Sequence, residues 1–284
     1  MIMTSELFEI FNKCYPELPM NEQVLATLLG EEPYEVIRQE EQEKVVGYSI
    51  VRENRILLLC VAPEEQGKGI GSSLVKKSEE YIKKMGYDTV VLGGFSSRLF
   101  LGATVDEEGY ENKHHAFFES LGYQANDGCC EMYMDLKGFR LEDVKVPVNP
   151  AGVSFGYYTD SDRTELYEAV AQVDKEWVQY FQNDAPVYIA KENGKVIGFA
   201  ILGYDDITLR SSGANRMGNT GCVGVVPSMR KGGVGLAMVA HAAQELKEHG
   251  CDESYIHYTH LVRWYAKLGY KPFLWFWFGS KKLG

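Results

Sequence analysis

The chain has 284 residues, of which 45% are hydrophobic, which is enough for two domain cores and excludes a largely disordered protein. Its 29 Lys and Arg stand against 40 Asp and Glu, and the net charge of −11 argues against a general affinity for nucleic acids or anionic membranes. No hydrophobic run approaches the roughly 20 residues that span a bilayer. The polar, acidic N-terminal residues also lack the pattern of a secretory signal peptide, so we expect a cytoplasmic protein.

The cysteines give no sign of a metal or redox centre. No two of them form the CxxC spacing of zinc sites and thioredoxin-like motifs, so reduced, buried thiols are expected. They stand at positions 14, 60, 129, 130, 222 and 251.

The first 61 residues predict two short helices followed by a meander of strands. Apolar residues recur at helical spacing between residues 5 and 30, and Pro16 and Pro19 interrupt the pattern. Aliphatic runs separated by charged turns follow, as in antiparallel strands. The predicted strands are 34–39, 44–51 and 55–61.

A longer helix is predicted from Ser72 to Gly86, because its apolar residues share one face and a glycine often ends a helix. A strand at 88–94 then leads into a glycine-rich, polar region. After it, a short helix ends at Gly122, and a strand at 130–136 is expected to close this half of the chain.

The boundary between two domains is expected within residues 138–151, where two prolines occur and helical periodicity is lost. We therefore expect an N-terminal domain over 1–140, a linker or crossover strand over 141–150 and a C-terminal domain over 151–284. The second half repeats the order of the first. Its predicted elements are a strand at 153–159, a helix at 161–181, a hairpin at 187–202 turning at Asn193 and Gly194, a strand at 221–227 and a buried final strand at 271–279.

One spacing aligns the two halves. A strand end, a glycine loop and a helix start each recur 164 residues later. The aligned pairs are Pro63 with Pro227, Gly69 with Gly233 and Gly71 with Gly235. The second half has about 13 extra residues before its loop, within 205–221, and the first about 17 after its loop, around 96–113, so we expect the insertions to form surface loops that shape the substrate pocket.

The repeated strand, glycine turn and helix predict an anion site. A helix N-terminus presents unpaired backbone NH groups, and glycines let the backbone approach a diphosphate closely. Lys68, Arg230 and Lys231 add positive charge. A P-loop is excluded because no Lys is followed by Ser or Thr in these loops, and neither loop contains the GxGxxG fingerprint of dinucleotide-binding folds.

The two loops resemble the acyl-CoA loop of the GNAT superfamily of N-acetyltransferases, which reads R/QxxGxG/A between the fourth strand and the third helix. Gln66, Gly69 and Gly71 match it in the first half. Arg230, Gly233 and Gly235 match it in the second. The helix pattern FYxxxGF that follows in the family is similar to residues 117–123 and 264–270.

The resemblance covers most of each half and implies an α/β (α+β) fold of two tandem GNAT domains, each with a mixed, mostly antiparallel central sheet flanked by helices. The layout is similar to that of mycothiol synthase. The cosubstrate implied is acetyl-CoA, without a metal. The implied acyl-CoA-binding residues are Leu59, Cys60, Val61, Gln66, Gly67, Lys68, Gly69, Ile70 and Gly71, and Val223, Gly224, Val225, Arg230, Lys231, Gly232, Gly233, Val234 and Gly235.

The two halves differ at the position of the family's catalytic tyrosine, which returns a proton to the leaving thiolate. Tyr265 stands there in the second half, whereas Phe118 in the first has no hydroxyl to donate. The resemblance therefore implies catalysis by Tyr265 in the C-terminal half. The base that deprotonates the amine is not identified. Its candidates are Glu176, Asp205, Asp206, Glu253 and His257.

We expect an N-acetyltransferase that acts on a small-molecule amine, with neither nucleic acid nor membrane as a partner. His257 and His260 lack the fixed spacing of a metal site, and His114 and His115 are expected in a loop or helix cap. Two alternatives stay open: a non-catalytic acyl-CoA-binding regulator or scaffold, and catalysis in the N-terminal half. The acceptor, the acyl length and the oligomeric state are not indicated by any motif.

Overall fold

The computed structural model describes residues 4–93, 102–106 and 113–284. Contacts divide the chain into two compact units. Unit 1 comprises residues 1–130, 207–214 and 274–284, and unit 2 comprises residues 131–206 and 215–273. The predicted insertion around 96–113 lies mostly outside the described residues.

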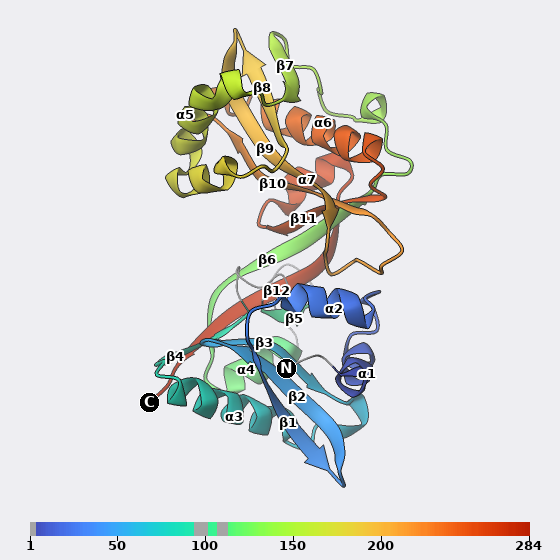
Figure 1. Cartoon of the computed structure of the whole chain (residues 1–284), viewed down its shortest axis with the longest axis vertical. Coiled ribbons are helices and arrows are strands. Elements are labelled where there is room, and N and C mark those ends of the chain that lie inside the picture. Colours follow the sequence, from blue (N-terminus) through green and yellow to red (C-terminus); the bar gives the residue numbers. More distant parts are fainter. Residues whose placement is uncertain (1–3, 94–101, 107–112) are drawn as a thin grey trace. The chain divides into compact units, whose positions relative to one another are not determined.

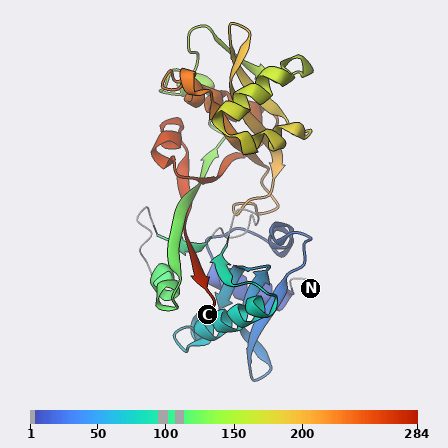
Figure 2. The ribbon, with the colours of Figure 1, turned by 90° about the vertical axis from the view of Figure 1, so that its left-hand side faces the viewer.

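Unit 1 begins with the two predicted helices, α1 (Ser5–Cys14) and α2 (Glu22–Leu29). Thr4 and Asn21 cap them by accepting hydrogen bonds from backbone NH groups in the first turn. The predicted meander follows as three antiparallel strands, β1 (Glu35–Glu41), β2 (Lys44–Arg52) and β3 (Arg55–Val61). Helix α3 (Ile70–Lys84) lies across these strands in Figure 2.

The apolar face of α3 packs on the sheet as its periodicity predicts, with Leu74, Val75 and Ile82 buried. Ser78 lies on the same face, and its hydroxyl is 2.7 Å from that of Ser49 on β2, so this buried polar pair satisfies itself. Met85, an apolar residue within the range of the predicted helix, is nevertheless 60% exposed, because the helix ends at Lys84 and the chain turns away there.

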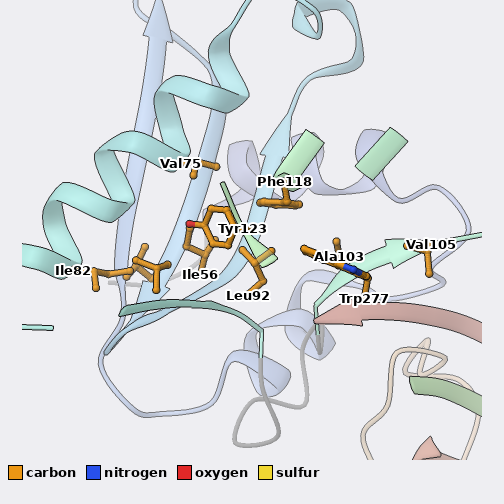
Figure 3. Packing of buried hydrophobic residues seen from close by; sticks show 11 residues of the cluster. Ile56, Val75, Ile82, Leu92, Ala103, Val105, Phe118, Tyr123 and Trp277 are labelled. Atoms are coloured by element: carbon orange, nitrogen blue, oxygen red, sulfur yellow. The ribbon is translucent and has the colours of Figure 1, made fainter. Parts of the chain in front are cut away.

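Unit 1 is completed by β4 (Thr89–Leu92), β5 (Ala103–Val105), α4 (Lys113–Ser120) and the end of β12 (Lys271–Lys282). Strand β3 pairs with β4 in parallel, and β12 pairs antiparallel with both β4 and β5. Trp277 of β12 is 2% exposed and belongs to the core cluster of this unit (Figure 3). The last strand of the chain therefore supplies part of the first unit's core.

Unit 2 contains an antiparallel meander of β7 (Val153–Tyr157), β8 (Val187–Glu192), β9 (Lys195–Asp206) and β10 (Met217–Val225). Asn193 and Gly194 make the predicted hairpin turn with positive φ angles of 51° and 79°. The predicted helix at 161–181 is interrupted at Asp174, so that α5 (Arg163–Val173) is followed by 3₁₀ turns over Lys175–Gln182.

Two helices cover this meander, with α5 and α6 (Val234–Glu248) on either side of β9 in Figure 1. Strand β10 then pairs in parallel with β11 (Glu253–Thr259), which is followed by the single turn α7 (Val262–Tyr265). Strand β6 (Gln124–Asp135), whose last residues belong to unit 2, lies next to β11 in the sheet order. Further 3₁₀ turns are Pro63–Glu65, Leu141–Asp143, Asp160–Asp162, Pro227–Met229 and Ala266–Leu268.

Both units confirm the predicted fold class, since each has a mixed, mostly antiparallel sheet flanked by helices. The strand at 130–136 was expected to close the first half, but residues 131–135 belong to unit 2. The predicted final strand is present as β12, and its residues 280–282 pair with β4 of unit 1. A β-strand can close any sheet whose edge it matches, and its sequence does not say which. The predicted division of the sequence into an N-terminal domain (1–140), a linker (141–150) and a C-terminal domain (151–284) stays a prediction.

We expect Trp277→Ala to destabilise unit 1 by about 3–5 kcal/mol, because a large buried ring leaves a cavity. Amide hydrogen exchange should show lost protection in α3, with α6 of unit 2 much less affected. Trp275→Ala on the same strand is the matched control, since Trp275 is only partly buried. Greater loss of protection in α6 than in α3 would contradict the assignment of the last strand to unit 1.

Candidate active sites

Both glycine loops turn in the same way at the start of a helix. Gly69 precedes α3 with φ = 82° and Gly233 precedes α6 with φ = 81°, both in the left-handed region that favours glycine. A positive φ also occurs two residues earlier, where the first loop has Gly67 at 77° and the second has Lys231 at 74°. The first turns of α3 and α6 therefore present backbone NH groups at matching places in the two halves.

The first side chain of each loop closes the turn instead of projecting outward. Gln66 Nε2 donates to the carbonyl of Val61 at 3.0 Å, and Arg230 Nε donates to the carbonyl of Val225 at 3.2 Å. This shared contact explains why either Gln or Arg suits the position. Lys68 binds Glu65 at 2.6 Å, so its charge is partly compensated within the loop.

An aromatic ring stands over the third loop glycine in both units. A Cβ on Gly71 would meet Phe117 at 3.3 Å, and one on Gly235 would meet Trp264 at 3.1 Å. These close approaches give a physical reason for the last glycine of the motif, namely that the helix start packs directly against an aromatic side chain.

The strands that lead into the loops carry a bulge and part from their parallel neighbours. In unit 1 the parallel pairing joins Arg55 and Ile56 of β3 to β4, and β3 has an extra residue between Ile56 and Leu58. In unit 2 the pairing of β10 with β11 covers Met217–Asn219, and β10 has one extra residue between Gly221 and Gly224, where Cys222 has φ = 47°. Backbone groups beyond these points face the opening between the strands.

A cavity of about 520 Å³ lies at this opening in unit 1. Residues from both diverging strands line it, including Leu58 and Leu59 of β3 and Leu92 of β4. Phe117 and Phe118 of α4 complete the apolar wall. Figure 3 shows the ring of Phe118 beside that of Tyr123 in the core of this unit. The volume is within the range of small-molecule and cofactor sites.

The predicted acyl-CoA residues of unit 1 fall into two groups. Most reach the cavity wall, whereas the Cys60 thiol and Ile70 are buried and Lys68 pairs with Glu65. Those that line the cavity are Leu59, Val61, Gln66, Gly67, Gly69 and Gly71. In unit 2, Val223–Val225 form the end of β10, Arg230–Gly233 form the loop, and Val234 and Gly235 begin α6.

Tyr265 and Phe118 occupy matching positions but differ in chemistry. Tyr265 is 6% exposed, and burial raises the pKa of its hydroxyl to about 12, so the group stays protonated at neutral pH. Its ring packs edge-on against Trp264 and Tyr270. Phe118 lies in the wall of the unit 1 cavity and has no proton to give.

The structure separates the candidate bases. Asp205 is exposed and held bidentately by Arg216 at 2.6 and 3.0 Å, and Glu176 lies in the 3₁₀ turns after α5. Asp206 is buried, and its Oδ2 is 2.5 Å from Nε2 of His257. Of the five candidates, Asp206 and His257 are therefore brought together. Glu253 is the first residue of β11 and pairs with Met217 of β10, two residue pairs before the two strands part.

A further ionisable residue beside this pair escaped the sequence analysis. Glu131 of β6 is 3% exposed, and burial raises the pKa of its carboxyl to about 7. The charge of Asp206 acts in the same direction, while His257 and a hydrogen bond from Tyr255 oppose it. No local signal indicated its burial, because Cys130 and Met132 point to the opposite face of the strand and Asp135, on the same face as Glu131, is exposed.

No metal site is indicated in the described part of the chain, where no three His, Cys, Asp or Glu side chains are grouped to hold an ion. The six cysteines, all within the described ranges, form no disulfides. Among the helices in residues 4–93, 102–106 and 113–284, none combines the length and apolarity needed to cross a membrane.

Family models match both halves of the chain. The model described as the GNAT acetyltransferase domain matches residues 32–125, and the one described as the GNAT acetyltransferase family matches residues 156–270. Together they account for well over half of the chain. This chain is a tandem GNAT protein. It therefore belongs to a superfamily of N-acetyltransferases, while the specific likeness to mycothiol synthase stays a prediction. A search of curated proteins finds no match.

Solved structures agree with this assignment. A GCN5-related glucosamine N-acetyltransferase region of a fungal multi-domain GH3 β-N-acetylglucosaminidase is 26% identical with a TM-score of 0.73, over 96% of this chain and 36% of that one. This chain therefore matches only about a third of the length of the fungal protein. A tandem GNAT protein of the clavulanic acid biosynthesis pathway is 16% identical, with a TM-score of 0.67 over 98% and 94% of the two chains. A GCN5-related N-acetyltransferase from Sphaerobacter thermophilus is 17% identical, with a TM-score of 0.67 over 98% and 91%.

The buried Glu131 predicts a pH dependence of stability. Below pH 4.5 the carboxyl is protonated in both states, and between pH 4.5 and 7 it ionises first in the unfolded chain. The free energy of unfolding should therefore fall by up to about 3 kcal/mol as the pH rises through this window. Glu131→Gln should remove that fall, as measured by urea unfolding with a probe in unit 2. The exposed Glu168→Gln is the control, and equal pH profiles for both variants would contradict the assignment.

Proposed function

We propose that the tandem GNAT protein transfers an acetyl group from acetyl-CoA to the amine of a small molecule, and that unit 2 performs the transfer. The observation that carries the proposal is the buried, protonated Tyr265 on the turn packed against the second glycine loop through Trp264. The loop NH groups would hold the diphosphate of acetyl-CoA. The exposed edge of β10 beyond its bulge would bind the pantetheine arm and the thioester oxygen.

The hydroxyl of Tyr265 suits the role of acid. Attack of the amine on the thioester expels a thiolate, which must be protonated to leave as CoA. A tyrosine with a pKa of about 12 remains in its acidic form across the working range of pH. No metal ion is required for this chemistry, and the absence of a metal cofactor stays a prediction.

The acceptor to test first is glucosamine. The fungal relative whose name includes glucosamine N-acetyltransferase is similar to this protein along 96% of the chain. An amino sugar also agrees with the expected small-molecule amine.

The cytoplasm is the proposed location, because the six free cysteines suit a reducing compartment.

A second candidate function belongs to unit 1, which combines a glycine loop and a cavity of about 520 Å³ with Phe118 in place of the acid. This supports acyl-CoA binding without turnover, as in a regulatory or scaffolding domain. Catalysis in unit 1 is the remaining alternative, since some acyl transfers proceed without a side-chain acid.

We expect Tyr265→Phe to lower kcat at least tenfold while leaving CoA affinity within about twofold, because it removes one hydroxyl and keeps the ring. Thiol release from acetyl-CoA with glucosamine and a panel of amines measures the rate. Tyr87→Phe, at a partly exposed turn of unit 1, is the control. Unchanged turnover in Tyr265→Phe would remove the assigned acid.

The loops themselves can be compared by Gly69→Glu and Gly233→Glu. Each adds a carboxylate and a strained backbone at an anion-binding turn with φ near 80°, so each should abolish binding at its own loop. We expect Gly233→Glu to remove thiol release and Gly69→Glu to remove one equivalent of bound CoA in calorimetry. If Gly69→Glu abolishes turnover and Gly233→Glu does not, catalysis must be assigned to unit 1 instead.

A further inference from the structure

A buried carboxylate, an amide and a histidine meet on one face of the unit 2 sheet. His257 Nε2 and Asn219 Nδ2 both lie 2.5 Å from Oδ2 of Asp206. The side chain of Asp206 is 4% exposed and that of His257 is 25% exposed. The imidazole therefore extends from a buried, fixed carboxylate toward solvent.

A bulge in β9 gives Asp206 this orientation. Asp206 pairs with Met217 and Gly203 pairs with Asn219, so β9 has one residue more than β10 over the same stretch. The extra residue turns Asp206 to the face of Asn219 and leaves Asp205 outside with Arg216. Helix α6 covers the opposite face of the sheet next to these residues. A Cβ added to Gly218 of β10 would lie 2.9 Å from the side chain of Leu246 in α6.

His257 stands where β11 has parted from β10. The last pair between these strands joins Asn219 to Tyr255, and His257 follows two residues later on the same face as Tyr255, with the two rings 5.2 Å apart. The spacing of 164 residues that aligns the glycine loops also aligns Gly93 with His257. Gly93 lines the cavity of unit 1, so His257 occupies the corresponding position beside the strand opening of unit 2.

The two halves thus differ at two aligned positions next to the opening. Unit 2 has His257 and Tyr265, whereas unit 1 has Gly93 and Phe118. A glycine and a phenylalanine cannot exchange protons, while a histidine and a tyrosine can do so in opposite directions. This difference at both positions is expected if unit 2 contains a base and an acid and unit 1 contains neither.

We propose that His257 is the base that accepts a proton from the acceptor's ammonium group, and that Asp206 is a positioning residue that fixes its ring. The inference rests on the proposed function. Because Nε2 faces the carboxylate, it carries the hydrogen, and Nδ1 is the accepting atom. The titratable groups around this ring include Asp206 of β9 and Tyr255 of β11, and Glu131 of β6 interacts with it electrostatically.

The proton balance closes with Tyr265 as the acid. The ammonium gives one proton to His257, which passes it to solvent, and the amine nitrogen forms a bond to the thioester carbonyl carbon. When the C–S bond breaks, its electron pair stays on sulfur and Tyr265 protonates it. The second nitrogen proton then restores Tyr265 through water, so acetyl-CoA and an ammonium yield amide, CoA and one proton.

The test compares His257→Gln, Asp206→Asn and the control Asp205→Asn in thiol release with glucosamine between pH 6 and 10. His257→Gln should lower kcat at pH 7 at least tenfold, with KM for acetyl-CoA within about threefold. The loss should shrink at high pH, where the amine is already deprotonated. Asp206→Asn should show the same trend more weakly, and Asp205→Asn should match wild type.

A loss below tenfold in His257→Gln, or a loss that is equal at every pH, overturns the inference. If His257→Gln does not fold, as judged by hydrogen exchange in α6, the pH trend of Asp206→Asn decides in the same way. Wild-type protein without thiol release on the whole panel overturns the proposed function and this inference with it. Active wild type with an unaltered variant profile overturns the inference alone.

Discussion

The early end of parallel pairing is the constraint on which both candidate sites depend. Strand β4 follows β3 for two residue pairs and β11 follows β10 for three, and then the strands diverge. Backbone groups on the facing edges lose their sheet partners there and require water or a ligand. The bulges, the glycine turns and the aromatic turns all lie around these openings, so their positions follow from the same divergence.

Sequence periodicity and spacing were sufficient for most elements and for the glycine loops. Local patterns determine these features: the apolar face of α3, the Asn193–Gly194 turn, and glycines that repeat at one spacing. The closing strands could not be assigned in this way, because their partners are distant in sequence and any edge strand offers the same hydrogen bonds. The break at Asp174 also escaped, because the apolar periodicity continues across it.

The site illustrates the same division between local and distant information. Tyr265 could be proposed as the acid from the sequence because a motif surrounds it. Asp205 and Asp206 are adjacent, and the sequence alone does not distinguish them as candidate bases. In the structure the bulge in β9 buries Asp206 and leaves Asp205 exposed beside Arg216. Glu131 joins the group only because β6 is a neighbour of β11, which no local pattern indicates.

The assignment of β12 to the first unit has a consequence for how this protein can be synthesised and divided. The chain's final residues hydrogen-bond to β4, which is completed some 190 residues earlier. During synthesis, this edge of β4 therefore stays open until β12 has been made, and open edges invite pairing with other molecules. Cutting the chain between the repeats would make that exposure permanent, so the first repeat by itself is expected to lack one strand of its own sheet.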